Sequence, residues 1–592
     1  MALAGAAAAA DLAEAGKAWW GHIAFLASDQ MQGRLTGTPA YDRAADYVAA
    51  QFKALGLKPA GAHGWFQPVR LVEQRVIADR SSAALVADGQ AQPLQLGQEL
   101  ILGARTPQPE TIEAPLVFIG YGLHIPQAGY DDFARADLRG KIVVVVNGGP
   151  ATLSGPLKSA ARSAETWRAV ERSGALGVIT LPTPKAMDIP WERQMLLASQ
   201  PGMYLADPDL QETAGPRFTA TVNPAQAEKL FARSGHSFAE VLALADAGQP
   251  IPGFALNLTL RAQVATEKRA LASSNILGVL PGSDPRLAGE YVVVSAHLDH
   301  LGVGEPINGD RIYNGAMDDA SGVASVLETA RALHDGRVRP KRSILFAVFT
   351  AEEKGLLGSR AFAQHPTVPK SALVADVNMD MFLPLWPLRR LMVEGAEESS
   401  LGEEARTVAA AQGYELVPDP FPDRNVFVRT DQFSFVRAGT PAVALKFGFL
   451  PGTAEAQIEH DWRANRYHSP SDDLSQPVDL EAAARFDAFL TALAVRIADE
   501  PARPMWLPGS PFAPAPPPRR AAADHPAGDA GRTPASARPA GLRLTPEFEE
   551  GRASPPPRLA SRSSASSSWR GAARARQGPW RPAPRSPPAA PG

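Results

Sequence analysis

Two adjacent carboxylates follow an apolar run near the middle of the chain. Residues 344–349 read Ile-Leu-Phe-Ala-Val-Phe, and Glu352 and Glu353 come three residues later. Acidic residues are depleted from strands and are rarely buried without a partner, so a pair just past a core strand indicates a binding site. We interpret Glu353 as a metal ligand and Glu352 as the group that handles a proton. Taken alone, the pair also fits a solvated loop.

Further acidic and histidine residues occur at the ends of predicted strands or in the loops after them. They are His297 with Asp299, Asp318 with Asp319, Asp380, and His468. Residues i and i+2 lie on one side of an extended chain, so the Asp299 carboxylate can hold the His297 ring while its other nitrogen binds metal. Asp318 can bridge two cations. Each residue has an ordinary structural explanation, but their joint occurrence predicts a metal centre.

The chain contains no cysteine, which limits the ligands of such a centre to nitrogen and oxygen. These donors suit a pair of catalytic zinc ions, with Co²⁺ or Mn²⁺ as substitutes. Two ions about 3.5–4 Å apart can clamp the attacking and the developing oxygens of a hydrolysis. We therefore expect two Zn²⁺ as cofactors.

The residues around these positions predict an α/β architecture. Near-continuous apolar runs alternate with helical patterns, which is typical of a sheet covered on both faces. The expected strands are 276–280, 291–295, 344–350 and 373–377, and the expected helices are 320–333 and 478–498.

The chain is too long for one core of usual size, so we expect several parts. Short β-like runs between about 69 and 265, with no acid and histidine cluster, indicate an inserted β-rich accessory domain. The predicted organisation is a signal remnant at 1–16, a catalytic domain at 17–68 and 266–505, the insert at 69–265 and a tail at 506–592.

The tail is predicted to be disordered. Residues 511–592 contain 18 of the 55 prolines, and such a composition cannot bury enough apolar surface to offset chain entropy. This segment carries Arg but no Lys and is net positive, so the remainder of a chain with net charge -3 is acidic. An acidic body favours a cation site and gives no indication of nucleic-acid binding.

The start of the chain is rich in small apolar residues and lacks a basic region. It fits either the end of a secretory signal or an Ala-rich terminus, and we expect the signal, with a secreted or periplasmic location. No apolar run reaches the roughly 20 residues of a membrane span.

At these motifs the sequence resembles the co-catalytic zinc aminopeptidases of metallopeptidase family twenty-eight, which includes glutamate carboxypeptidase and, as a receptor, transferrin receptor. The resemblance covers roughly residues 17–505. The matching elements, in order, are His297-Leu298-Asp299, residues 318–322, residues 350–359, residues 378–380, residues 431–435 and Tyr467-His468. The insert is similar, over about 113–225, to a protease-associated domain.

The resemblance implies a zinc-exopeptidase fold (phosphorylase/hydrolase-like), in which helices sandwich a mixed sheet. It implies that Asp318 bridges both ions, that His297 and Asp380 complete one site, and that Glu353 and His468 complete the other. Glu352 would be the general base, Asp299 would orient His297, and Tyr467 would donate to the oxyanion. It also implies a cis peptide between Asp318 and Asp319.

Three functions remain open at this point. The favoured one is an aminopeptidase that hydrolyses the N-terminal bond of peptides or proteins, because every ligand position and the base position are filled. A glutaminyl-cyclase-like enzyme would use a single zinc ion, and a non-catalytic receptor or scaffold would use none. The number of bound ions separates the three.

Overall fold

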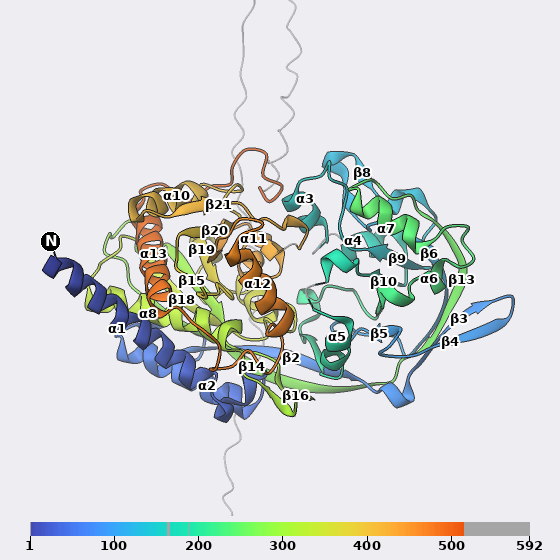
Figure 1. Ribbon diagram of the computed structural model, residues 1–592, viewed down its shortest axis with the longest axis horizontal. Coiled ribbons are helices and arrows are strands. Elements are labelled where there is room, and N and C mark those ends of the chain that lie inside the picture. Colours follow the sequence, from blue (N-terminus) through green and yellow to red (C-terminus); the bar gives the residue numbers. More distant parts are fainter. Residues whose placement is uncertain (1, 163–165, 188, 425, 514–592) are drawn as a thin grey trace, which may run out of the picture. The chain divides into compact units, whose positions relative to one another are not determined.

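The computed structural model describes residues 2–162, 166–187, 189–424 and 426–513 (Figure 1). The chain divides into two units, residues 1–517 and 518–592, and every described residue belongs to the first. From residue 514 onward the predicted disordered tail lies outside the described residues. Residues 506–513, which the prediction included in the tail, belong to the first unit and pack within it: the ring centroids of Phe512 and Phe427 lie 5.4 Å apart.

The largest sheet has ten strands and a parallel centre. Four neighbouring parallel strands form this centre, in the order β18 (Ser343–Phe349), β15 (Tyr291–His297), β19 (Leu373–Met379) and β22 (Ala442–Phe447). Every residue of these four strands is buried except Tyr291, the first residue of β15, which is partly buried. This burial explains why their sequences are apolar throughout rather than alternating.

Antiparallel strands extend the sheet on both sides. Next to β18 lie β14 (Thr266–Leu280), β2 (Phe66–Val76) and β11 (Gly202–Leu205), with β1 (Lys58–Pro59) paired to β14. Next to β22 lie β20 (Arg390–Glu394) and, parallel to it, β21 (Glu415–Val417). The sheet is therefore mixed, as expected.

Helices cover both faces of this sheet. Alternate residues of β18 divide between two hydrophobic clusters: Ile344, Phe346 and Val348 join one, and Leu345, Ala347 and Phe349 join the other. The first cluster includes residues of α1 (Ala2–Leu26), α2 (Pro39–Ala54), α8 (Ser321–Asp335), α10 (Leu401–Gln412) and α13 (Leu480–Asp499). The second includes residues of α9 (Leu357–Gln364) and α11 (Gln432–Arg437).

The first helix, α1, packs into the hydrophobic cluster on one face of the large sheet. Trp19, Ile23 and Leu26 are fully buried, and the Trp19 indole donates hydrogen bonds of 3.1 Å to the main-chain oxygen of Ser321 and to the Ser325 hydroxyl. Among the described residues, no helix combines the length and apolar character needed to cross a lipid bilayer.

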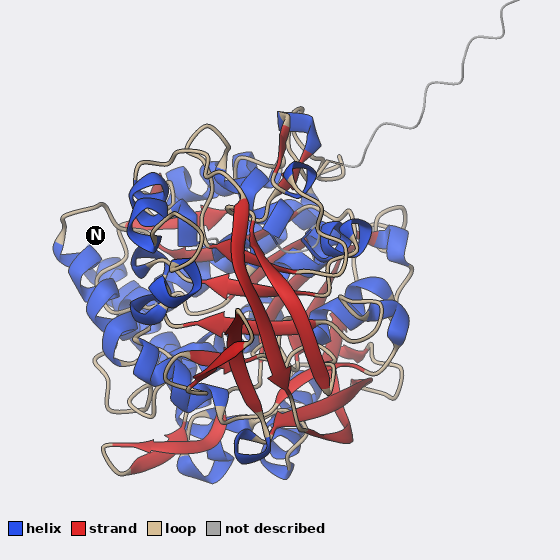
Figure 2. Cartoon of the chain, turned by 90° about the vertical axis from the view of Figure 1, so that its right-hand side faces the viewer, coloured by secondary structure: helices blue, strands red, loops and turns tan. Residues whose placement is uncertain are grey.

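The insert forms a second sheet of eight strands with a core of its own (Figure 2). The strands, in spatial order, are β4 (Gln90–Leu94), β3 (Ser82–Ala87), β13 (Phe254–Gln263), β6 (Thr111–Phe118), β9 (Ile142–Val146), β10 (Gly177–Leu181), β12 (Phe218–Val222) and β5 (Leu100–Leu102). Figure 2 views the side on which β3, β4 and β13 are labelled in Figure 1, and long strands face the viewer there.

Short helices complete the insert. They are α3 (Gly155–Ala160), α4 (Thr166–Ser173), α5 (Trp191–Ala198), α6 (Glu228–Phe231) and α7 (Phe238–Asp246).

Two features join the insert to the large sheet. Strands β2 and β14 pair antiparallel from Phe66↔Ile276 to Val76↔Thr266, beyond the predicted domain boundary at residue 69, and β11 leaves the insert to pair with β2.

Candidate metal centre

The predicted ligands come together at the carboxyl ends of the central parallel strands. His297 is the last residue of β15, and Asp380 directly follows β19. Glu353 lies in the turn after β18, and Asp318 lies just before α8. Parallel strands place their carboxyl ends along one sheet edge, so residues far apart in sequence become neighbours there. His468 joins them from the loop after α12 (Ala454–Asn465).

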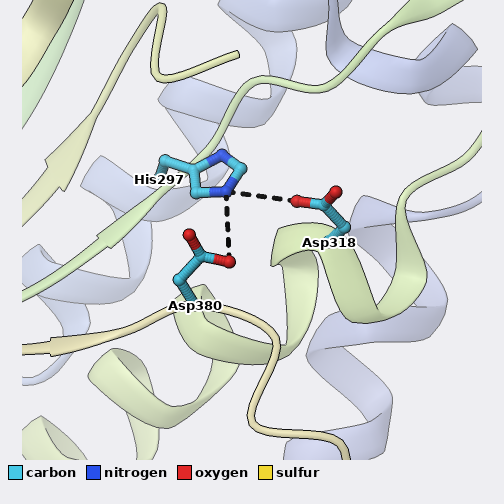
Figure 3. A group of neighbouring side chains, drawn as sticks. All are labelled: His297, Asp318 and Asp380. Atoms are coloured by element: carbon cyan, nitrogen blue, oxygen red, sulfur yellow. Dashed lines mark ion pairs between the residues drawn. The ribbon is translucent and has the colours of Figure 1, made fainter. Parts of the chain in front are cut away.

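The first cluster is formed by His297, Asp318 and Asp380 (Figure 3). The Nε2 atom of His297 lies 3.3 Å from Asp318 Oδ1 and 3.9 Å from Asp380 Oδ1. All three residues are buried. Figure 3 shows the imidazole edge facing both carboxylates, which is the arrangement that one shared cation requires.

The second cluster uses the other oxygen of Asp318. His468 Nε2 lies 3.3 Å from Asp318 Oδ2 and 3.2 Å from Glu353 Oε2. Asp318 therefore presents Oδ1 to one group of ligands and Oδ2 to the other. The peptide bond between Asp318 and Asp319 is cis, as the resemblance implies.

The residues present fit a metal centre because their buried polar atoms lack partners. Within the described part of the chain, no hydrogen bond is made by His297 Nε2, Asp318 Oδ2, Glu353 Oε1 or Asp380 Oδ1. Buried polar atoms are normally satisfied, and leaving one without a partner costs about 1–3 kcal/mol. Four such atoms converging from separate elements are explained by cations that they would bind together.

Glu352 lies beside the first cluster, with Oε2 3.9 Å from His297 Nε2. Burial raises the pKa of its carboxyl well above the ordinary value; His297 opposes that rise, and Asp380 and Glu353 reinforce it. A carboxylate with a raised pKa is a stronger base than one in water, which suits proton transfer.

Asp299 departs from the expected arrangement. The Nδ1 atom of His297 lies 3.0 Å from the main-chain oxygen of Asp299 and 4.0 Å from its carboxylate Oδ1. The carboxylate instead accepts a hydrogen bond of 3.0 Å from the main-chain N–H of Glu352. The main-chain oxygen is the nearer partner of the ring, so the Asp299 side chain is left to hold the turn that carries Glu352.

Tyr467 is buried and stacks beside His468, with ring centroids 3.9 Å apart. Its hydroxyl accepts a hydrogen bond of 3.3 Å from Arg429 Nη2. Burial raises the pKa of this hydroxyl, so it stays protonated and able to donate.

Protonation of the histidines competes with metal binding. Burial alone lowers the pKa of His468, but Glu353 and Asp318 outweigh burial and raise it to about 9. The same balance, with Glu352 and Asp318 as the main acidic neighbours, raises the pKa of His297. A histidine must be neutral to bind a cation, so ion binding would release protons from the centre.

Several supporting residues escaped the sequence analysis. Asp472 accepts hydrogen bonds from the main-chain N–H groups of Met317 and Asp318, at 3.0 and 3.1 Å. Arg34 is fully buried and donates to the main-chain oxygens of Leu298, Leu26, Asn314 and Gly315. These contacts join distant segments through main-chain atoms, so they cannot be predicted from a local pattern of residues.

His300 was also missed, although it directly follows Asp299. It is fully buried, and its Nδ1 atom lies 2.7 Å from Glu353 Oε1 and 3.8 Å from Asp318 Oδ2. His300, Asp318 and Glu353 form a second group able to hold a cation. Three of the four residues at 297–300 are acidic or histidine, and this density in the sequence could have indicated His300 as a further candidate ligand.

A cleft of about 780 Å³ leads to the centre. The part of the chain that carries the two clusters contributes Glu352, Glu353, Tyr467, His468 and Arg429 to its lining. The insert contributes residues 101–106 and parts of α4 and α5. A cleft of this volume can hold several amino-acid residues of a ligand.

A family model described as peptidase family M28 matches residues 275–494. A probable zinc metalloprotease of Pyrenophora tritici-repentis is 28% identical over 262 residues, 39% of this chain and 58% of that protein. Aminopeptidase YwaD of Bacillus subtilis is 28% identical over 228 residues, 36% of this chain and 45% of that protein. The chain thus spans less than two thirds of the length of these curated relatives.

Among solved structures, the aminopeptidase from Aneurinibacillus sp. strain AM-1 is similar with a TM-score of 0.48 and 20% identity, covering 83% of this chain and 96% of that one. The family match does not extend to the insert, so its protease-associated identity stays a prediction. All of the predicted ligands lie inside the matched residues. The residues that build the centre therefore lie in the part of the chain that is similar to peptidase family M28, residues 275–494.

Proposed function

We propose that this protein is a zinc-dependent exopeptidase that removes N-terminal residues from peptides, with two Zn²⁺ ions held by His297, Asp318, Asp380, Glu353 and His468. The observation that carries the proposal is the geometry of Asp318, whose two oxygens lie 3.3 Å from histidine nitrogens of two separate clusters. Zinc with nitrogen and oxygen ligands supplies a Lewis acid and lowers the pKa of a water that it binds.

The chain's own residues then have distinct tasks. Glu352 lies beside the first cluster, and it would accept a proton from the attacking water and deliver it to the leaving amine. Asp299 would fix Glu352 by accepting the N–H of that residue. The Tyr467 hydroxyl, held by Arg429, would donate a hydrogen bond to the oxygen that gains charge.

The substrate proposal rests on the family and on the cleft. Peptide substrates are supported by the similarity of residues 275–494 to a peptidase family, and YwaD of Bacillus subtilis is named an aminopeptidase. We extend both to this chain as a proposal, together with Co²⁺ or Mn²⁺ as substitute ions and a secreted or periplasmic location.

The test is a metal count followed by a substrate panel. The full chain is stripped with a chelator, reloaded with zinc, and assayed on aminoacyl nitroanilides, on peptides with a blocked C-terminus and on peptides with an acetylated N-terminus. We expect near two zinc ions per chain, cleavage of the first two substrate types and no cleavage of the third. One ion with cyclisation of N-terminal glutamine would favour the cyclase, and a chain that binds no metal would exclude the peptidase.

A further inference from the structure

His300 shares the properties of the predicted ligands without being one of the ligands that the family resemblance implies. It is fully buried at the rim of the second cluster, where its ring packs edge-to-face on His468 with centroids 5.9 Å apart. Both of its ring nitrogens lack a hydrogen-bond partner among the described residues. The approach of 2.7 Å to Glu353 Oε1 is close, but the two atoms are not aligned as a hydrogen bond.

A neutral imidazole has one donor and one acceptor nitrogen, and burial of both without partners is costly. His297 differs, because its Nδ1 has the main-chain oxygen of Asp299 and only Nε2 lacks a partner. The nitrogen of His300 nearest the centre, Nδ1, therefore lacks a positively charged or hydrogen-bonding partner, and the surrounding side chains do not supply one. The surroundings of that nitrogen are carboxylate oxygens, which attract a cation to the same place.

The distances fit a shared ion. Two atoms that bind one zinc ion at about 2.0–2.2 Å lie roughly 3–3.5 Å apart. His300 Nδ1 lies 2.7 Å from Glu353 Oε1 and 3.8 Å from Asp318 Oδ2, which brackets that separation. His468 approaches the same two residues through Asp318 Oδ2 and Glu353 Oε2, so Glu353 turns one oxygen to each histidine.

Resting on the proposed function, we propose that His300 binds the second cation through Nδ1, together with Glu353, His468 and Asp318. The two ions are then held unequally: one imidazole serves the His297 cluster, and two serve the His468 cluster. The nitrogen-rich cluster would retain its ion more strongly, so a chelator would remove the ions in two separate steps.

The first measurement needs no variant. X-ray absorption of the full chain loaded with two zinc ions counts imidazoles directly, and we expect an average of 1.5 per zinc, since three histidines would serve two ions. An average of one imidazole per zinc would overturn the proposal, because His297 and His468 alone account for it.

The second measurement is zinc titration of the stripped chain against a competing chelator, combined with the visible spectrum of the Co²⁺ form. In His300→Asn, the dissociation constant of one ion should rise at least tenfold and the other should change less than twofold, with a changed Co²⁺ spectrum. His334→Asn, which replaces an exposed histidine at the end of α8, is the matched control and should match the wild type.

The outcomes separate the two proposals. If the wild type binds two ions and His300→Asn binds both with unchanged affinity and spectrum, His300 is not a ligand and the peptidase proposal stands. A wild type that binds no ion would overturn both. Should His300→Asn fail to fold, as seen by circular dichroism, the imidazole count on the wild type still decides.

Discussion

Arg193 and Tyr467 are joined by a hydrogen bond of 2.9 Å, from Nη1 of Arg193 to the main-chain oxygen of Tyr467. The second Nη atom of Arg193 donates to the main-chain oxygen of Ala464, at 2.6 Å. Arg193 belongs to α5 of the insert, and Tyr467 immediately precedes His468. Arg105, also from the insert, donates a bond of 2.8 Å to the main-chain oxygen of Glu353. The insert thus holds the two loops that carry Glu353 and His468 of the second cluster.

Replacing Arg193 should weaken the second cluster without unfolding the protein. Arg193→Ala removes two charge-assisted hydrogen bonds, each worth about 1.5–3 kcal/mol when buried and less at this half-buried position. We expect roughly tenfold weaker binding of one zinc ion, measured by titration against a chelator. Glu192→Ala, at the exposed neighbouring position, is the control. Equal zinc affinity in Arg193→Ala and the wild type would show that the insert does not support the centre.

Glu352→Gln should separate metal binding from catalysis. The amide keeps the size of the side chain but cannot accept the proton, so aminoacyl nitroanilide hydrolysis should fall by about 10²–10⁴-fold. Zinc content should remain that of the wild type, because Glu352 is not among the predicted ligands. The measurement pairs steady-state kinetics with elemental analysis. Activity within tenfold of the wild type would refute the assignment of Glu352 as base.

Stability should depend on pH through Glu394, at the end of β20. Burial, reinforced by Asp419 and opposed by Lys446, raises the pKa of this carboxyl from 4.5 to about 8. Between these values the folded chain holds a proton that the unfolded chain has released, so the free energy of unfolding falls as pH rises. The amide in Glu394→Gln does not titrate, so this fall in the free energy of unfolding is absent from the variant. Relative to the wild type it should gain stability between pH 5 and 9, on the order of a few kcal/mol at the upper end.

Thermal unfolding of both proteins across this pH range tests the Glu394 prediction. The difference between their midpoints is the relevant quantity, because titrating groups that do not interact with Glu394 cancel in it. Glu397→Gln, at an exposed site nearby, should follow the wild type at every pH. A midpoint difference that stays constant with pH would contradict the raised pKa.

Trp19 should anchor α1 to α8, the helix that follows Asp318. Its indole is fully buried and bonds to Ser321 and Ser325 at the start of α8. Trp19→Ala should cost about 3–5 kcal/mol of stability through lost burial and a cavity. Urea unfolding measures this loss, with the partly buried Trp20→Ala as the comparison. A loss under about 1 kcal/mol would mean that α1 contributes little to the core.

The sequence was informative where local pattern decides structure. The strands predicted at 276–280, 291–295, 344–350 and 373–377 correspond to β14, β15, β18 and β19, because buried parallel strands are apolar at every position. The helices predicted at 320–333 and 478–498 correspond to α8 and α13. The convergence of the predicted ligands followed from their places after strands whose carboxyl ends share one edge.

Other features could not be predicted because they depend on contacts between distant segments. Strand β11 is a four-residue stretch inside the insert, and its pairing with β2 across some 130 residues leaves no mark in its composition. The main-chain oxygen of Asp299 took the role expected of its carboxylate. Arg105 and Arg193 look like ordinary surface arginines until the tertiary structure sets them against main-chain oxygens.

The long pairing of β2 with β14 bears on attempts to shorten this protein. A deletion that joins residue 69 directly to residue 265 would remove most of β2, and β11 with it, so β14 would be left with an open hydrogen-bonding edge. Exposed edges of this kind promote aggregation. A shortened form of the protein would therefore have to keep β2, β14 and β11, and lose residues only from the rest of the insert.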